Sequence, residues 1–551
     1  MNIALHSLTK ALSETSPNDT LNLGMKTQVE ADLILFNANV ITMNPHLTHA
    51  RMVAIRSGRI IWVGENEELS AYQGNRTRII DCRGKTVIPG FHDAHMHLFS
   101  LISSLMSLDC SPASVSSIVD IQELVSEKAM QLPAGTWIKG AEYNKFYLEE
   151  GRHPDRRDLD KAAPFHPVKL AHRTRYACVL NSRGLSLAGI TAETPDPPGG
   201  LIDREIGTGE PTGLLFGMNA YLSKHVVPPL SEAEFQQGTR QANDLLLSAG
   251  ITSLQDATVH NEPAQWKTLK RIKASGVFQP RVTMMFGFES LVQFKEILGS
   301  ADEDLRVGPM KIVIDEISGS LNPPQPILNA MVLAAHSAGF QVAIHAIEDT
   351  TVEAAIIALE NALGVMPKTD HRHRIEHCSE CPDHLLERLK QTGAMVVTQP
   401  AFLYFNGERY LVEVAPEKLP WLYRIGAFSR KGIRVAASSD APVIPPDPFY
   451  GIYAATTQRS QNGEIFNPDE TVTPEQALRM YTLGGACSSC EDDIKGSITE
   501  GKMADLVVLS DDLTSIAPEG ILDIAVEKTI IGGQVVWERV QANQAFPRKQ
   551  R

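Results

Sequence analysis

Two histidines one residue apart, His95 and His97, stand in the segment PGFHDAHMHL. Residues i and i+2 of a β-strand face the same side, so both imidazoles can reach one point at the end of a strand. Paired imidazoles of this kind can bind a divalent metal ion. The pair alone does not decide the matter, because histidines at this spacing also occur as core or surface residues without a metal.

Four more candidate side chains fall on or at the end of other segments expected to be strands. In a parallel (β/α) barrel the carboxyl ends of all strands open on one face, so residues far apart in sequence can converge there. Each could also be an ordinary core histidine, a turn cap or a salt-bridging lysine, but their occurrence on successive strand-helix units favours a metal centre. The four are Lys311 in KIVID, His345 in VAIHA, His377 in RIEH and Asp440 in AASSDAP.

The elements that would position these residues alternate between strand-like and helix-like patterns over residues 90–489. About eight such alternations are typical of an α/β fold, a distorted (β/α)8 TIM barrel. One helix start is specific: Ser231 followed by Glu234 has the spacing of a capping box, and Gly250 ends that helix before the strand ITSLQDA. Residues 109–228 are too long for a single connection, so we expect an insertion after barrel strand 1 that caps the barrel mouth.

Short β-rich runs with Ser-Gly and Arg-Gly turns fill residues 27–89, and similar runs recur in residues 490–545. Chain termini usually lie close together on a domain surface, so we expect one small composite β-sandwich built from both ends. Residues 1–26 are polar and irregular. They are interpreted as a flexible N-terminal extension or as a consequence of start-site choice, with Met25 as the alternative start.

Composition limits the class of protein. With 551 residues, 43% of them hydrophobic and 21% charged, the chain is expected to be globular with more than one packed unit. A formal charge of −14 repels a phosphate backbone, so no nucleic-acid partner is expected. No apolar run reaches the roughly 20 residues that span a bilayer, and no signal peptide precedes the strands. We therefore expect a cytoplasmic protein with no membrane partner.

Seven cysteines include two CxxC pairs, Cys378/Cys381 and Cys487/Cys490. The pairs could form a four-thiolate zinc site or a redox couple. Neither pair stands in a zinc-knuckle or thioredoxin context, so free thiols in a reducing compartment are favoured.

The motifs PGFHDAHMH, HAIED, RIEH and SSDAPV resemble the HxH, HAxGD, RIEH and GSDxPV signatures of the amidohydrolase superfamily, in the branch that includes N-substituted formamide deformylases. The similarity extends over most of the chain, from GRIIWVG through the DPPGG loop to GSITEGKMADLVVL. It implies a barrel with a β-sandwich, and Asp440 as both metal ligand and catalytic base. The other ligands that it implies are His95, His97, His345 and His377.

Lys311 is similar in position to a lysine that is carboxylated and bridges two metal ions in many binuclear members of the superfamily. A free ammonium cannot ligate a cation, so Lys311 would need carboxylation or a lowered pKa. A plain salt-bridging lysine is the alternative. Two departures from the branch pattern, Glu348 in HAIED and Asp315-Glu316 at the end of the strand that Lys311 begins, add carboxylates near the expected mouth and argue against transferring a particular substrate.

The predicted activity is hydrolysis of an amide, N-formyl or cyclic amide C–N bond in a small molecule by a metal-activated water. Imidazole ligands favour one or two Zn²⁺ ions, with Mn²⁺, Fe²⁺ or Co²⁺ as alternatives. Three alternative functions stay open: a one-metal deaminase of a heterocyclic amine, a lactone or ester hydrolase, and a regulatory protein on the same scaffold. A homodimer is expected.

Seven aromatic residues could line the mouth of the barrel or belong to its core. They are Trp137, Tyr143, Phe146, Tyr147, Phe402, Tyr404 and Phe405.

Overall fold

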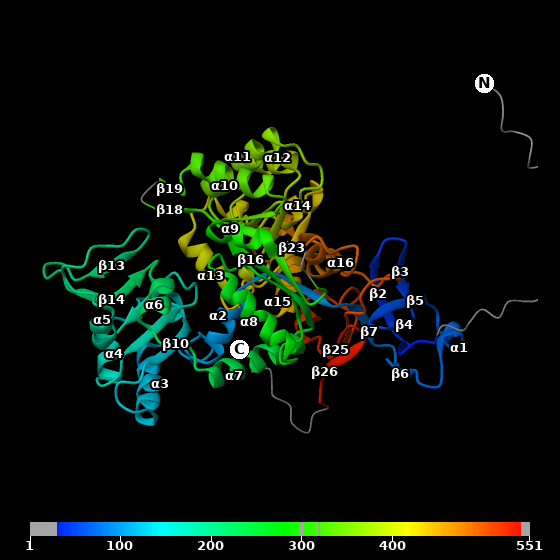
Figure 1. The fold of residues 1–551 in the computed structure, drawn as a ribbon, viewed down its shortest axis with the longest axis horizontal. Coiled ribbons are helices and arrows are strands. Elements are labelled where there is room, and N and C mark those ends of the chain that lie inside the picture. The colour runs from blue at the N-terminus through cyan, green and yellow to red at the C-terminus, as the bar shows by residue number, and fades with distance from the viewer. Residues whose placement is uncertain (1–29, 298–301, 318–319, 541–551) are drawn as a thin grey trace, which may run out of the picture.

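The computed structural model describes residues 30–297, 302–317 and 320–540. The extension expected over residues 1–26 and the last residues of the composite domain, 541–545, lie outside this part. Figure 1 shows three units side by side: a β-rich unit that contains β2–β7, the barrel in the centre and the insertion around β10–β14 on the other side.

Eight strands form one sheet in which every neighbouring pair is parallel. The N–H of Asp440 donates to the carbonyl of His95 (2.8 Å), and that of His97 donates to the carbonyl of Ala441 (2.7 Å), which joins the last strand to the first. The sheet is therefore a nearly closed barrel, and the predicted fold class is confirmed. In order around the barrel the strands are β8 (Phe91–Met96), β15 (Ile251–Asp256), β16 (Arg281–Gly287), β17 (Leu305–Val313), β20 (Val342–Ala346), β21 (Arg374–His377), β22 (Met395–Thr398) and β23 (Val435–Ala437).

Helices cover the outside of the barrel, so strands such as β8, β15 and β21 are buried along their whole length. The predicted capping box exists: Ser231 and Glu234 cap α7 (Glu232–Ser248), and Gly250 follows with φ +77°. Other helices of this layer are α8 (Pro263–Ala274), α9 (Leu291–Ile297), α10 (Gln325–Ser337), α11 (Asp349–Val365), α12 (Asp383–Thr392), α13 (Ala401–Glu413), α14 (Ile425–Arg430) and α15 (Pro448–Thr457).

The β-rich unit combines both ends of the described chain. Val508 of β24 lies opposite Val87 of β7 in an antiparallel pair, so strands more than 400 residues apart share one sheet. Leu35, Val53 and Ile530 bring both sheets of this unit into a single apolar core. The first sheet has the order β5 (Arg59–Gly64), β4 (Met52–Arg56), β1 (Leu33–Phe36), β6 (Arg78–Asp81), and the second β26 (Gln534–Glu538), β25 (Val526–Ile531), β24 (Leu506–Leu509), β7 (Thr86–Pro89), β2 (Asn39–Asn44), β3 (Leu47–Ala50).

The insertion is a folded unit with its own sheet and its own buried core. It leaves the barrel after α2 (Leu98–Leu105) and returns through α7. The hydroxyl of Tyr147 donates to the carbonyl of Phe405 in α13 (3.0 Å), so the insertion touches the chain that follows barrel strand β22. Its strands are β9 (Leu108–Asp109), β10 (Ile138–Tyr143), β11 (Val168–His172), β12 (Ala177–Leu180), β13 (Leu201–Arg204) and β14 (Pro211–Phe216), and its helices are α3 (Ile118–Gln131), α4 (Arg156–Ala162), α5 (Ser182–Ala188) and α6 (Asn219–His225).

All seven cysteines lie in the described ranges and carry free thiols. Cys378 and Cys381 are buried, whereas Cys490 is exposed. Within those ranges, no helix is both long enough and apolar enough to cross a membrane.

Candidate metal centre

Three of the six candidate residues meet where the first and last barrel strands close. Metal-binding atoms of His95, His97 and Asp440 all lie within 4.8 Å of one another. Oδ1 of Asp440 is 3.5 Å from Nε2 of His95 and 3.2 Å from Nε2 of His97. His95 lies on β8 and His97 directly after it, as the HxH spacing predicted, while Asp440 follows β23 with a left-handed φ of +58°.

His377 and His345 extend this group around the barrel. The ring of His377 lies 4.8 Å from that of His95 and 4.4 Å from that of His345, measured between centroids. His377 is the last residue of β21 and has φ +67°, which breaks the strand alternation at this point. Its side chain can therefore join the group although the neighbouring Glu376 also points inward.

Lys311 of β17 is only 2% exposed, and its Nζ has no hydrogen-bond partner in the described part of the chain. Burial lowers the pKa of Lys311 to about 8, against the opposing effect of Glu376 and Asp440. The positive charge of Lys311 in turn lowers the pKa values of His345 and His377. Lys311 is therefore a buried amine that has no hydrogen-bond partner in the described ranges although carboxylates and imidazoles lie near it, and such an unpaired donor calls for an explanation.

Glu376 was not among the predicted site residues, yet it fixes the orientation of His95. Its Oε2 accepts a hydrogen bond from Nδ1 of His95, and its other oxygen pairs with Arg374, with both side chains of that pair fully buried. Arg374 also donates to the carbonyl of Ala94 (2.8 Å) and to Oε1 of Gln255 (2.5 Å). Because Nδ1 of His95 donates to Glu376, its Nε2 keeps a lone pair toward the site.

Two more histidines are oriented in the same way by residues that the sequence did not single out. Nδ1 of His377 donates to Oε1 of Gln399 (2.8 Å), and Gln399 donates to the hydroxyl of Ser438 (2.9 Å). Nδ1 of His97 lies 2.9 Å from the hydroxyl of Thr258. The only sequence signal for these partners is that they are polar residues at or just beyond the ends of barrel strands.

Asp93 holds the backbone on both sides of the centre. It accepts hydrogen bonds from the N–H of His95 (3.3 Å), from the N–H of Ser439 (3.1 Å) and from the hydroxyl of Ser439 (2.5 Å). Burial raises the pKa of Asp93 to about 6, while the Ser439 hydrogen bonds act against this rise. Asp93 thus connects β8 to the residue before Asp440.

Burial leaves the imidazoles of His95, His345 and His377 without a second proton near neutral pH. Burial lowers the pKa of His95 to about 3, and it also lowers the pKa values of His345 and His377. Burial alone would raise the pKa of Asp440, but the imidazoles of His97, His95 and His377 outweigh it and hold that pKa below its usual range. Neutral imidazoles and a buried carboxylate fit a divalent cation, which binds deprotonated ligands.

Of the aromatic residues considered for the mouth, some belong to apolar cores and others lie where the insertion touches the barrel. Tyr143 is fully buried in the core of the insertion, and Trp137 packs against a second cluster in the same unit. Phe402 and Tyr404 of α13 pack against another small core. Tyr147 meets Phe405 where the insertion touches the barrel. The additional carboxylates Asp315 and Glu348 are exposed, and the partial loss of solvent around each raises its pKa.

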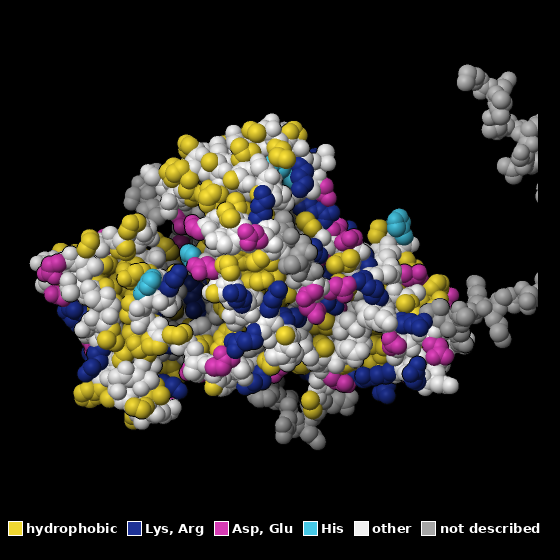
Figure 2. All heavy atoms as spheres, in the orientation of Figure 1, with side chains coloured by type: hydrophobic (Ala, Val, Ile, Leu, Met, Phe, Trp, Pro, Cys, Tyr) yellow, Lys and Arg dark blue, Asp and Glu magenta, His cyan; other side chains and the backbone are white. Residues whose placement is uncertain are grey.

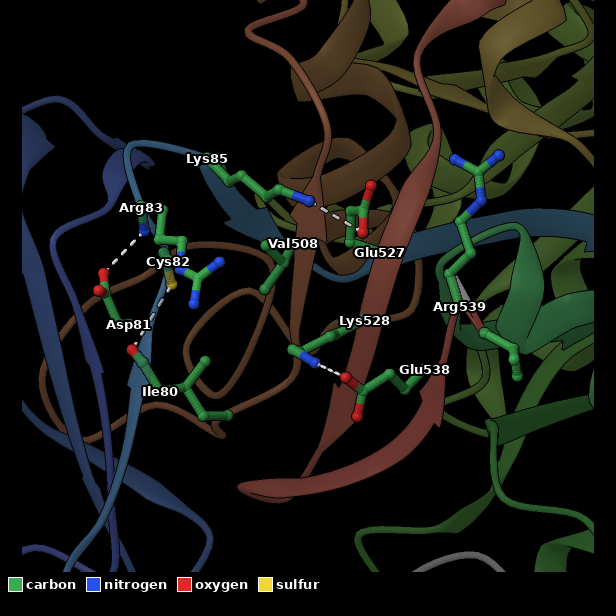
Figure 3. Close-up of a pocket in the computed structure, with 11 residues that line it drawn as sticks. Ile80, Asp81, Cys82, Arg83, Lys85, Val508, Glu527, Lys528, Glu538 and Arg539 are labelled. Atoms are coloured by element: carbon green, nitrogen blue, oxygen red, sulfur yellow. Dashed lines mark hydrogen bonds and ion pairs between the residues drawn. The ribbon is translucent and has the colours of Figure 1, made fainter. Parts of the chain in front are cut away.

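A separate cavity of about 640 Å³ lies in the β-rich unit, between β6 and the strands β24–β26 (Figure 3). Its charged side chains largely neutralise one another. Lys85 pairs with Glu527 (2.9 Å), and Lys528 pairs with Glu538. None of the six candidate residues lines this cavity.

Comparison with known proteins agrees with the geometry. The chain is 29% identical over 525 residues to the protein named amidohydrolase YtcJ of Bacillus subtilis, covering 91% of this chain and 98% of that one. It is 28% identical over 544 residues to N-substituted formamide deformylase of Arthrobacter pascens, covering 92% and 98%. The crystal structure of an uncharacterized metal-dependent hydrolase from Pyrococcus furiosus is similar with a TM-score of 0.68 at 26% identity, over 88% of this chain and all of that one.

The model of the amidohydrolase family matches residues 78–537, most of the chain. The match includes all eight barrel strands and all six candidate residues. The chain therefore belongs to the amidohydrolase family and is a metal-dependent hydrolase.

Proposed function

We propose that this hydrolase cleaves the C–N bond of an amide, an N-formyl group or a cyclic amide in a small molecule. The observation that carries the proposal is the position of Asp440, whose Oδ1 lies 3.2 Å from Nε2 of His97 and has no hydrogen-bond partner in the described ranges. An ionised carboxylate with a free lone pair beside a metal site is suited to accept a proton from water and deliver it to a leaving nitrogen.

The residues that would hold the metal are His95, His97, His345, His377 and Asp440. A divalent cation bound there lowers the pKa of water and polarises a carbonyl group. The chain contributes the orientation of its imidazoles through Glu376 and the other hydrogen-bond partners of Nδ1. Imidazole ligands favour Zn²⁺, with Mn²⁺, Fe²⁺ or Co²⁺ as alternatives.

Lys311 supports a second metal ion in this proposal. Its lowered pKa of about 8 leaves part of the amine unprotonated near neutral pH, as reaction with carbon dioxide requires. A carboxylated Lys311 would supply two oxygens in place of one ammonium, and it would remove the buried ammonium that has no hydrogen-bond partner in the described ranges.

The test is a substrate screen on metal-replete protein together with the variant Asp440→Asn. The main arm of the screen tests the proposed activity with N-formyl amines, N-acyl amines and cyclic amides. A second set, of heterocyclic amines and lactones, tests the competing activities. We expect hydrolysis in the main arm, and Asp440→Asn should lower kcat by about 10²- to 10⁴-fold because the proton acceptor is lost. Full activity of Asp440→Asn on a confirmed substrate would contradict the role of Asp440, and ammonia release from heterocyclic amines alone would replace the proposal with deamination.

A further inference from the structure

Arg173 lies directly after β11 of the insertion and is only 7% exposed. Its side chain makes no ion pair and no hydrogen bond in the described part of the chain, although its nitrogens keep a little solvent access. Other buried arginines of the protein are paired with a carboxylate: Arg374 with Glu376, and Arg281 with Asp505. An unpaired buried guanidinium costs folding free energy, so a role outside folding is indicated.

Arg409 and three tyrosines, Tyr410, Tyr147 and Tyr423, lie near enough to Arg173 to affect its pKa. Burial lowers the pKa of Arg173, and the positive charge of Arg409 lowers it further.

The contacts of Arg409 in α13 use only some of the hydrogen-bond donors of its guanidinium group. It pairs with Glu413 (2.8 Å) and lies over the ring of Tyr410 (5.0 Å to the centroid). Its Nε is nevertheless buried without a hydrogen-bond partner. The two guanidinium groups thus keep donors that the chain itself does not use.

This arginine pair lies where the insertion meets the carboxyl ends of the barrel strands. Tyr147 bonds to Phe405 of α13, the helix that follows β22. The N–H of Tyr423 donates to the carbonyl of Ser379 (2.9 Å), two residues beyond His377 of the metal centre. Figure 2 shows a hollow between the insertion and the barrel, with basic, acidic and histidine side chains at its rim.

We propose that Arg173 and Arg409 form a subsite for an anionic group of the substrate. The planar guanidinium fork binds a carboxylate or phosphate with two parallel hydrogen bonds, and it does so most strongly where water is excluded. The inference rests on the proposed function and narrows its substrate class to amides that carry an acid away from the bond that is cleaved. Arg173 would bind the anionic group of the substrate, while the carbonyl group of the bond to be cleaved would lie at the metal centre.

The kinetic test compares each hydrolysed N-acyl or N-formyl amino acid with its uncharged carboxamide. Wild type should prefer the acid by about tenfold to hundredfold in kcat/KM, since hydrogen bonds to charged groups contribute that much. Arg173→Met should remove this preference through a higher KM for the acid, and Arg173→Lys should keep part of it. The matched control is Arg157→Met, which removes an arginine of the same unit that is 65% exposed and should retain the preference.

A binding test does not depend on turnover. Benzoate and inorganic phosphate are added separately, and the unfolding temperature is recorded for wild type, Arg173→Met and Arg157→Met. We expect one anion to raise the unfolding temperature of wild type and Arg157→Met but not of Arg173→Met, and the more effective anion identifies the group. Without an anion, Arg173→Met should unfold at a higher temperature than wild type because an unpaired buried charge is removed.

The outcomes separate the two proposals. If no amide is hydrolysed but the anion shift depends on Arg173, the subsite stands and the proposed function fails. If amides are hydrolysed with no preference for the acid and no anion shift, the function stands and the subsite is wrong. A lower unfolding temperature of Arg173→Met, with the preference for the acid retained, would show a purely structural arginine.

Discussion

Glu376 accepts a hydrogen bond from Nδ1 of His95 across 281 residues of sequence, and neither side chain is more than 1% exposed. The same carboxylate pairs with Arg374, so an arginine, a glutamate and a histidine form a buried chain through the barrel interior. This chain aims Nε2 of His95 at Asp440. Histidine ligands held in this way by a carboxylate are common in metal sites.

The variant Glu376→Gln should lower the affinity for metal by about 10- to 100-fold, because His95 loses the carboxylate that orients it. It should also lower the free energy of unfolding by about 3–5 kcal/mol, because Arg374 stays buried without a counter-charge. Metal titration and denaturant unfolding measure the two effects. The double variant Arg374→Met/Glu376→Leu is the control: it should regain stability but not metal affinity. Unchanged affinity in Glu376→Gln would show that this contact does not orient a ligand.

The variant Lys311→Met should decrease the number of metal ions bound per chain and lower activity. Its metal-free form should be at least as stable as wild type, because a buried amine with no hydrogen-bond partner is replaced by an apolar side chain of similar length. Metal analysis, and carbon-13 NMR after incubation with labelled bicarbonate, provide the measurements. A carbamate signal in wild type that is absent from the variant is the expected result. Equal metal content in both proteins would assign Lys311 a purely structural role.

The variant Thr258→Val should weaken metal binding by about tenfold, since Nδ1 of His97 loses its hydroxyl partner. Thr258→Ser keeps the hydroxyl and should bind metal as wild type does. The measurement is metal affinity by competition with a chromogenic chelator. Equal losses in both variants would point to packing of the threonine methyl group instead of the hydrogen bond.

Stability should depend on pH through His373, a buried residue outside the metal centre. Its Nδ1 accepts from the N–H of Val342 (3.0 Å), and its Nε2 lies 2.8 Å from Nδ1 of His336. Burial lowers the pKa of His373 to about 2, so the unfolded chain binds a proton more readily than the folded one. The stability it contributes is present above the unfolded pKa of about 6.5 and is lost as pH falls toward 2.

Denaturant unfolding of metal-free protein at several pH values between 7.5 and 5 measures this dependence. His373→Asn should flatten the slope by up to about 1.4 kcal/mol per pH unit below pH 6, because one linked proton is removed. Metal-free wild type is the reference, since the buried histidines of the metal centre contribute equally to both proteins. His336 and His371, which act on His373, are part of the effect that is measured. A parallel pH dependence in the two proteins would contradict the assignment.

Local signals in the sequence were sufficient for much of the architecture. The Ser231 capping box and the left-handed Gly250 mark helix ends through hydrogen bonds and backbone angles within a few residues, so they can be predicted without tertiary contacts. The strand-helix alternation likewise predicted the barrel. The six-stranded sheet of the insertion was not predicted, because its strand pairs join segments whose partners are chosen by long-range packing.

For the site, the sequence by itself determined which side chains could converge. His95 and His97 share a strand face, and the other candidates end parallel strands that open on one side. Only the tertiary structure decided the partners that orient them, such as Glu376 for His95, and left Arg173 buried without a carboxylate. Hydrogen bonds and burial between distant segments depend on how the whole chain packs, and no local pattern of residues encodes that packing.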